Sequence, residues 1–226
     1  GDYRLIALAP ASVQEMADFV GLAFELAFKY RNPAIILADG VIGQMMEKVV
    51  LPVQKPRRTD AEVIEQCPWA TTGRTHHRTP NIITSLELDP AEMEKRNIHL
   101  QKKYAEIEEN EVRFEELHCE DAEYLIVAFG SCARIAQKAM EMAREEGIKV
   151  GLLRPITLWP FPSKAIAARA AQVKGILTVE LNAGQMVEDV RLAVKCKVPV
   201  EHFGRLGGIV PDPDEVITAL KEKLIK

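Results

Sequence analysis

Residues 124–131 read YLIVAFGS, an apolar run that ends at a glycine and a serine. A short apolar run bounded by turn residues is typical of a strand that is buried on both faces of a parallel sheet. The residues that follow have helix-forming character up to Glu146, and Gly147 ends the helix. This stretch therefore predicts a strand, a tight turn and a helix, which together are one βα unit.

The same order recurs along the rest of the chain. Further strands are predicted at residues 150–154, 175–181 and 198–203, and further helices at 163–173, up to 194, and 213–225. Successive βα units with short connections predict an α/β domain with a doubly wound parallel sheet, right-handed crossovers and helices on both faces. We place this domain at residues 120–226.

A separate βα unit opens the chain. Residues 5–9 and 34–38 read as buried strands around a helix that Ser12 caps, with Glu15 reaching back to the cap. Two parallel strands do not form a stable sheet with both faces covered, and the stretch after the second strand reads as a loop. Residues 1–58 are therefore expected to be the end of an α/β domain whose other strands lie upstream, so that the chain is a C-terminal piece of a longer protein.

Between these regions, residues 59–119 are expected to form a linker with a long charged helix. The stretch 59–89 reads as irregular, and His76 and His77 read as part of a polar loop because no Cys or acidic partner lies at metal-ligand spacing. Residues 90–117 predict one helix with a narrow apolar seam at seven-residue spacing. The seam consists of Met93, Leu100, Ile107 and Phe114, with Tyr104 beside it. This helix either lies across its own protein or packs on a partner subunit.

Composition excludes several classes of protein. The chain has 226 residues, 47% hydrophobic and 27% charged, with a net charge of −4. These values are ordinary for a soluble globular protein and argue against a nucleic-acid surface, and no apolar run is long enough for a membrane helix. The four cysteines form no C-x-x-C pair, so we expect no metal or iron–sulfur site from this chain alone. Cys132 and Cys196 lie in apolar settings and read as buried free thiols, and reduced thiols fit a cytoplasmic protein.

Ligands of an open parallel sheet bind beyond the carboxyl ends of its strands. Gly130 and Ser131 lie there, at the start of a helix, and could hold an anion. The alternative is a tight turn with a capping serine. Arg154 and Arg205 also follow strands, and they could neutralise a phosphate or carboxylate or pair with acids across a subunit boundary.

Five segments, in this order, resemble the α-type subunit of 2-oxoacid:ferredoxin oxidoreductases, most closely the 2-ketoisovalerate and 2-oxoglutarate members. The segments are GDYRLIALAPASVQEM (1–16), NPAIILADGVIGQMMEKVVLP (32–52), LRPITLWPFP (153–162), VELNAGQMVEDVR (179–191) and HFGRLGG (202–208). The resemblance covers the whole chain. It implies the remnant of a thiamine-binding, pyrimidine-binding α/β domain, followed by a domain like the C-terminal domain of transketolase.

The resemblance also implies an activity, which is the oxidative decarboxylation of a 2-oxoacid, here 2-ketoisovalerate, with coenzyme A to give an acyl-CoA, CO₂ and reduced ferredoxin. Thiamine diphosphate would carry the chemistry. The upstream region and a partner subunit would hold it with Mg²⁺, and iron–sulfur clusters would lie on another subunit. The implied partners are β, γ and ferredoxin-like δ subunits. This chain alone is expected to bind no cofactor, to be inactive and to serve chiefly in assembly.

Turn position together with motif membership makes five residues candidates for cofactor binding at the rim of the coenzyme A approach. They are Ser131, Arg154, Asn182, Gln185 and Arg205. We expect no catalytic residue and no metal ligand in this chain.

Asp39 and Gly40 follow a strand, as in the G-D-G motif that holds magnesium and thiamine diphosphate. However, Ala38 precedes them and no pair of Asn residues follows, so this match is rejected. Two other functions stay open at this point. One is a stand-alone flavodoxin-like module that binds a phosphate at Gly130 and Ser131, and the other is a non-catalytic assembly protein.

Overall fold

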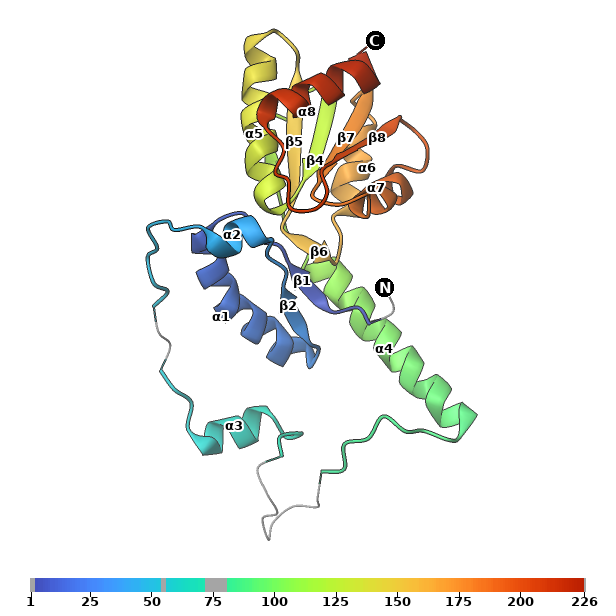
Figure 1. Ribbon diagram of the computed structural model, residues 1–226. Coiled ribbons are helices and arrows are strands. Elements are labelled where there is room, and N and C mark those ends of the chain that lie inside the picture. Colours follow the sequence, from blue (N-terminus) through green and yellow to red (C-terminus); the bar gives the residue numbers. More distant parts are fainter. Residues whose placement is uncertain (1–2, 54–55, 72–80, 226) are drawn as a thin grey trace. The chain divides into compact units, whose positions relative to one another are not determined.

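The computed structural model describes residues 3–53, 56–71 and 81–225 (Figure 1). The chain forms two compact units, one made of Gly1–Leu51 and Lys103–Lys226 and the other of Pro52–Lys102. Among the residues described, no helix combines the length and the apolar character that a membrane span requires.

The larger unit contains a five-stranded sheet with the strand order β3-β5-β4-β7-β8. Its strands are β3 (Phe114–Leu117), β4 (Tyr124–Ala128), β5 (Val150–Pro155), β7 (Gly175–Glu180) and β8 (Val200–Gly204). All neighbouring pairs are parallel except β3 and β5, which are antiparallel at one edge. From the central strand β4 the chain proceeds to β5 on one side and to β7 and β8 on the other. The predicted α/β class and doubly wound order are confirmed, with an added antiparallel edge strand.

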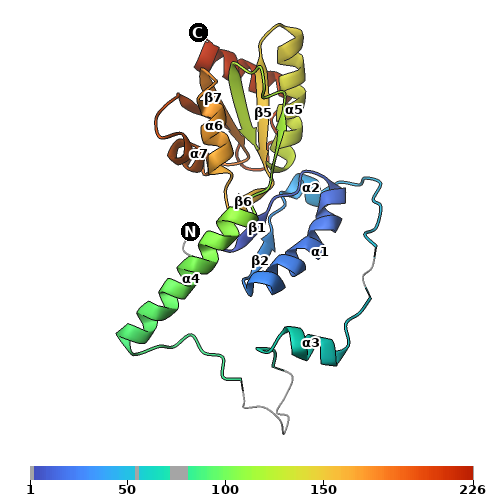
Figure 2. The ribbon, with the colours of Figure 1, turned by 180° about the vertical axis from the view of Figure 1, so that it is seen from behind.

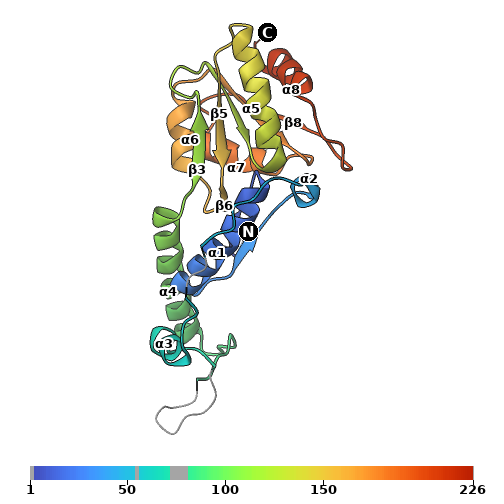
Figure 3. The ribbon, with the colours of Figure 1, turned by 90° about the vertical axis from the view of Figure 1, so that its left-hand side faces the viewer.

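Helices cover both faces of this sheet (Figure 3). They are α5 (Gly130–Glu145), α6 (Ser163–Ala170), α7 (Met186–Val194) and α8 (Pro213–Leu220), which continues into the π-helix η1 (Lys221–Ile225). On one face, α5 and α8 pack on Ile126 and Leu177, and on the other face α6 and α7 pack on Leu125 and Ile176. Because successive strand residues point to opposite faces, one continuous apolar run supplies both cores.

The long charged helix is shorter than predicted. Helix α4 (Pro90–Asn110) ends before Phe114, and the residues from Phe114 to Leu117 pair with β5 instead. The prediction of one helix to residue 117 is therefore wrong, and Phe114, which is 40% exposed, does not belong to the helical seam. These residues gain their hydrogen bonds from a strand far along the sequence, so that long-range pairing overrides local helix propensity.

A three-stranded sheet contains the opening βα unit. Its strands are β1 (Ile6–Leu8), β2 (Ala34–Ile36) and β6 (Thr157–Trp159), in the order β2-β1-β6. β1 and β2 are parallel as predicted, and α1 (Val13–Tyr30) connects them. β6 pairs antiparallel with β1 and was predicted as loop (Figure 2). The chain thus returns from the larger sheet to add a strand to the smaller one.

The last two turns of α4 pack on this smaller sheet. Ile107 has no exposed surface and lies in a cluster with Ile6 of β1 and Leu26 of α1. The rings of Tyr104 and Trp159 meet edge to face, with their centroids 6.0 Å apart. This end of the helix therefore lies across its own protein, which was one of the two alternatives.

Two short helices form where the sequence predicted irregular structure. They are α2 (Gly40–Gln44), capped by Asp39, and α3 (Asp60–Gln66), capped by Thr59. Thr59 and Glu62 form a reciprocal capping box, a T-x-x-E signal that was present in the sequence and overlooked. The predicted cap Ser12 is confirmed, since its Oγ accepts a hydrogen bond from the N–H of Glu15 at 3.1 Å.

The cysteine predictions are half right. Cys132 is buried, and burial, reinforced by the charges of Asp39 and Glu180, raises the pKa of its thiol to about 12. Cys196 is exposed, because it lies in the turn after α7 with a left-handed φ of 59°. The histidines His76 and His77 lie outside the described residues.

Truncating Ile107 tests the packing of α4 on the smaller sheet. Ile107→Ala should lower the free energy of unfolding by about 2–5 kcal/mol, because the site is fully buried. Ile98→Ala is the matched control on the same helix, where the side chain is 51% exposed, and we expect a change within about 0.5 kcal/mol. Urea denaturation followed by circular dichroism measures both, and equal midpoints for the two variants would contradict the packing.

Candidate functional site

The carboxyl end of β4 meets the loop after β2. Gly130, with φ at +61°, turns the chain into α5, and the N–H of Ser131 donates to Oδ2 of Asp39 at 2.8 Å. The other carboxylate oxygen accepts from Val41 and Ile42 at 3.0 Å and so caps α2. A helix N-terminus attracts anions. Here the position predicted for a bound anion is occupied by a carboxylate of the chain itself.

This turn also requires glycine for reasons of space. A Cβ on Gly130 would lie 2.7 Å from Oδ2 of Asp39, in addition to the strain of a left-handed φ. The hydroxyl of Ser131 is buried and has no hydrogen-bond partner, so it does not cap α5. The capping role that the sequence suggested for Ser131 is therefore taken by Asp39.

Arg154 of β5 binds Glu15 of α1 through two parallel hydrogen bonds. Nη1 and Nη2 donate to the two carboxylate oxygens at 2.8 and 2.7 Å. Nε of Arg154 also forms an ion pair with Oε2 of Glu115 in β3, and the two atoms are 3.0 Å apart. The angles of this contact do not meet those of a hydrogen bond. Burial acts to raise the pKa of Glu15, but hydrogen bonds from Arg154 and from the N–H of Ala11 outweigh it and lower the pKa. The arginine thus joins the two sheets, and its charge is neutralised within the chain.

We call this contact the junction, defined by Glu15, Asp39, Ser131 and Arg154. A further ion pair beside it joins Arg134 of α5 and Glu47 at 2.6 Å. An open cavity of about 280 Å³ lies among these charged groups. Figures 1 and 3 show α2 beside the first turn of α5, where the junction lies.

The turn after β7 is organised by Glu180, which the sequence analysis did not select. Its side chain is fully buried and accepts three backbone hydrogen bonds at the start of α7. The donors are the N–H groups of Gln185, Met186 and Val187, at 3.1, 2.8 and 3.0 Å. The signal that could have revealed it is an acidic residue ending an apolar strand shortly before a helix. A second helix N-terminus is therefore also occupied by a carboxylate of the chain.

The remaining candidates lie around this turn. Oδ1 of Asn182 accepts from the N–H of Gly184 at 2.7 Å, a local turn, and Gln185 is exposed at the N-cap of α7. The N–H of Arg205 donates to the carbonyl of Glu180 at 3.3 Å, and its guanidinium pairs with Glu215 at 2.9 Å. The five candidates thus form two groups, Ser131 and Arg154 at the junction and the other three beside Glu180.

These residues do not fit a diphosphate or its metal ion. The two helix N-termini and the Arg154 guanidinium already bind carboxylates, so no free positive site remains among them. Across residues 3–53, 56–71 and 81–225, no three His, Cys, Asp or Glu side chains are close enough to bind a metal. Cofactor contact by any of the five residues stays a prediction, and the geometry assigns them no chemical step.

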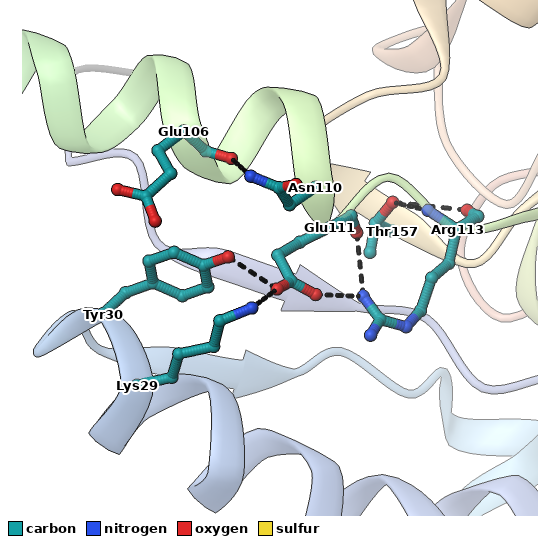
Figure 4. A network of polar contacts seen from close by, with 7 residues as sticks. All are labelled: Lys29, Tyr30, Glu106, Asn110, Glu111, Arg113 and Thr157. Carbon is teal, nitrogen blue, oxygen red and sulfur yellow. Dashed lines mark hydrogen bonds and ion pairs between the residues drawn. The ribbon is translucent and has the colours of Figure 1, made fainter.

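A buried carboxylate also organises the end of α4 (Figure 4). Glu111 accepts hydrogen bonds from Tyr30 at 2.6 Å, Lys29 at 2.7 Å and Arg113 at 2.9 Å. The backbone N–H of Arg113 in turn donates to Thr157 of β6 at 2.9 Å. This network connects α1, the end of α4 and β6, and all its members lie in the larger unit.

Removing the Asp39 carboxylate should loosen the junction. We expect Asp39→Ala to lower the free energy of unfolding by about 1–3 kcal/mol, since it removes the cap of α2 and the acceptor for Ser131. Asp60→Asn, an exposed acidic residue on α3, is the control, with a change within about 0.5 kcal/mol. Denaturant titration measures both, and an Asp39→Ala protein as stable as the control would show that the contact contributes nothing.

The Glu111 network predicts a dependence of stability on pH. Burial acts to raise the pKa of Glu111, but hydrogen bonds from Lys29, Tyr30 and Arg113 outweigh it and lower the pKa to about 2. The resulting stabilisation is complete above the ordinary pKa of 4.5 and is lost as the pH falls towards 2. Glu111→Gln should remove about 1–3 kcal/mol at pH 7 and flatten this acid slope.

Glu106→Gln, an exposed residue one turn earlier in the helix, is the control and should keep the slope of the natural sequence. Urea unfolding at a series of pH values measures all three proteins. Parallel curves for Glu111→Gln and the natural sequence would contradict the role of Glu111.

Comparison with known proteins shows the family. A model described as pyruvate flavodoxin/ferredoxin oxidoreductase, thiamine diphosphate-binding, matches residues 1–118, and one described as pyruvate:ferredoxin oxidoreductase core domain II matches residues 122–216. Ketoisovalerate oxidoreductase subunit VorB of Methanothermobacter marburgensis is 48% identical, over 98% of this chain and 61% of that protein. The 2-oxoglutarate synthase subunit KorA of Archaeoglobus fulgidus is 33% identical, over 94% of this chain and 60% of that protein.

A solved structure of a 2-oxoglutarate:ferredoxin oxidoreductase from Magnetococcus marinus shares the fold, with a TM-score of 0.72 at 22% identity, over 96% of this chain and 42% of that one. The chain thus spans about three fifths of the length of the curated relatives. The subunit letter differs between these relatives, so the predicted α-type label is not supported by their names. The matches along its whole length show that the chain belongs to the family of 2-oxoacid:ferredoxin oxidoreductase subunits.

Proposed function

We propose that this chain is part of a thiamine-diphosphate-dependent subunit that oxidatively decarboxylates 2-ketoisovalerate with coenzyme A and reduces ferredoxin. The observation that carries the choice of substrate is the gap in identity between two groups of relatives. The ketoisovalerate relatives are 48% and 47% identical, whereas the 2-oxoglutarate relatives are 30–33% identical.

Within that enzyme, the described residues serve assembly. We assign residues 1–58 to the end of the pyrimidine-binding domain, 59–119 to a linker and 120–226 to a domain that buttresses the first. The support is the junction, where Arg154 and Asp39 hold the two sheets together through charge-assisted hydrogen bonds. A fixed relation between domains is what an active site built from several chains requires.

The cofactors and partners follow from the family. Thiamine diphosphate and Mg²⁺ would be held by the upstream region and a partner subunit, and iron–sulfur clusters by another subunit, because this sequence has no C-x-x-C pair. Coenzyme A contact with the loops of Asn182, Gln185 and Arg205 remains part of the proposal, since they lie at strand ends. The four cysteines are free thiols, which supports a cytoplasmic location.

The two other functions are less well supported. A stand-alone module that binds phosphate at Gly130 and Ser131 would have to displace the Asp39 carboxylate, which accepts from Ser131 at 2.8 Å. A non-catalytic assembly protein would share every structural feature described above, and only an assay of the complete enzyme separates it from the proposal.

The complete subunit, assembled with its partners, tests the proposed activity. Coenzyme-A-dependent reduction of ferredoxin should show a kcat/KM for 2-ketoisovalerate at least about tenfold above that for 2-oxoglutarate or pyruvate, the discrimination expected of an apolar pocket. The same assay without coenzyme A is the control. Preference for 2-oxoglutarate would overturn the substrate, and no turnover with any 2-oxoacid would favour the assembly protein.

A further inference from the structure

The carboxylate at the centre of the junction belongs to a chemically labile pair of residues. Asp39 precedes Gly40, and no other Asp or Asn in the sequence is followed by glycine. Glycine has no Cβ, so its backbone nitrogen meets little hindrance when it attacks the side chain of the preceding residue. An unfolded chain is therefore expected to react at this position before its other acidic residues.

The reaction is an isomerisation through a cyclic imide. The backbone nitrogen of Gly40 attacks Cγ of the protonated Asp39 side chain, and a C–N bond forms while a C–O bond breaks. The hydroxyl oxygen leaves as water with the amide proton, and the product is a five-membered succinimide. A second water then opens the ring at the main-chain carbonyl carbon of Asp39, so that the chain continues through Cγ as isoaspartate. Neither step needs an oxidant or a cofactor.

The folded structure holds Asp39 away from this reaction. Oδ1 accepts from the N–H groups of Val41 and Ile42 at 3.0 Å, and Oδ2 accepts from the N–H of Ser131 at 2.8 Å. Ring closure would have to turn the carboxyl group towards Gly40 and break all three hydrogen bonds. The extended backbone, with ψ at 165°, also keeps Cβ of Asp39 and the nitrogen of Gly40 out of the eclipsed arrangement that the ring requires.

Gly40 itself contributes nothing to this protection. A Cβ built at Gly40 would have nothing within 4 Å, and the residue is not among the glycines with a left-handed φ. An alanine would therefore fit. The contact with Ser131 joins residues 92 positions apart in the sequence, and it is lost when the two sheets separate. The same event that opens the junction thus makes the Asp-Gly pair reactive.

The product would not restore the junction. Isoaspartate lengthens the backbone by one carbon and shortens the side chain by one, so its carboxylate cannot return to the N–H groups that Asp39 binds. The first turn of α2 would lose its cap, and the start of α5 would lose its acceptor.

We propose that Asp39–Gly40 is an isomerisation site that the folded junction protects, and that conversion to isoaspartate in the unfolded subunit disables the junction permanently. Each opening of the junction then carries a chemical risk in addition to the conformational change. The inference does not depend on the proposed activity, because none of its measurements is of turnover.

Peptide mapping of the complete subunit tests the protection. The subunit is incubated at neutral pH and one temperature, either folded or unfolded in guanidinium chloride, and then digested with trypsin. Asp39 lies in the tryptic peptide 32–48, in which electron-transfer fragmentation distinguishes aspartate from isoaspartate. Isomerisation should be at least about tenfold slower in the folded subunit, a factor that corresponds to about 1.4 kcal/mol. Asp60, which an alanine follows, is the internal control and should stay aspartate in both samples.

Two substitutions separate the chemistry from the fold. Gly40→Ala should fold with an unchanged or raised melting temperature and should suppress most of the isomerisation in guanidinium chloride. Gly130→Ala places a Cβ 2.7 Å from Oδ2 of Asp39 and so displaces the carboxylate. It should speed isomerisation in the folded subunit at least about fivefold, the effect of losing the favourable geometry of a strained contact.

Refolding tests the consequence. After incubation in guanidinium chloride and dilution, the fraction of natural subunit that regains its melting temperature should fall in step with isoaspartate at position 39, whereas Gly40→Ala should refold fully. Equal rates of isomerisation in the folded and unfolded states would overturn the protection. Full refolding of isoaspartate-containing subunit would overturn the damage to the junction. Should Gly130→Ala fail to melt cooperatively, the comparison of the two states of the natural sequence decides alone.

Discussion

The rest of the structure depends on internal carboxylates that neutralise positive positions at the strand ends. Asp39 lies at the start of α5, Glu180 at the start of α7, and Glu15 on Arg154. Each positive position would otherwise be desolvated without a partner, which costs several kcal/mol for a charge. Two of these contacts join segments far apart in the sequence, and they therefore fix how the smaller sheet meets the larger one. Their main contribution is geometry, since a buried ion pair often adds little net stability.

This arrangement is consistent with the assembly role that we propose for the doubly wound domain. The edge of such a sheet where ligands usually bind is formed by strand ends and helix N-termini. In this chain the same edge holds Asp39 of the neighbouring segment and Glu180 of its own strand, so that the electrostatic attraction available to a cofactor phosphate is used within the protein.

Individual elements show which parts of the structure local sequence patterns can predict. The strands at Tyr124 and Gly175 could be predicted because both of their faces are buried, and a continuous apolar run has no other common explanation. The strand at Phe114 was missed, because its sequence, FEEL, has two adjacent glutamates and no period-two alternation, and so fits the end of a charged helix as well as an edge strand. Ser131 and Arg154 could be selected as polar groups at strand ends, whereas their partners Asp39 and Glu15 lie 92 and 139 residues away along the chain. Glu180 was missed, although it lies in the recognisable segment VELNAGQMVEDVR (179–191).

The sequence by itself determined the α/β class, the buried parallel strands, the cap of α1 and the family, because these depend on local periodicity and on recognisable segments. Only the tertiary structure decided that β6 pairs with the smaller sheet and that β3 forms one edge of the larger sheet. It also decided which carboxylate binds each positively charged group. Pairings of this kind depend on distances between residues remote in the chain, and side-chain type alone does not specify them when several acids could each neutralise the same charge.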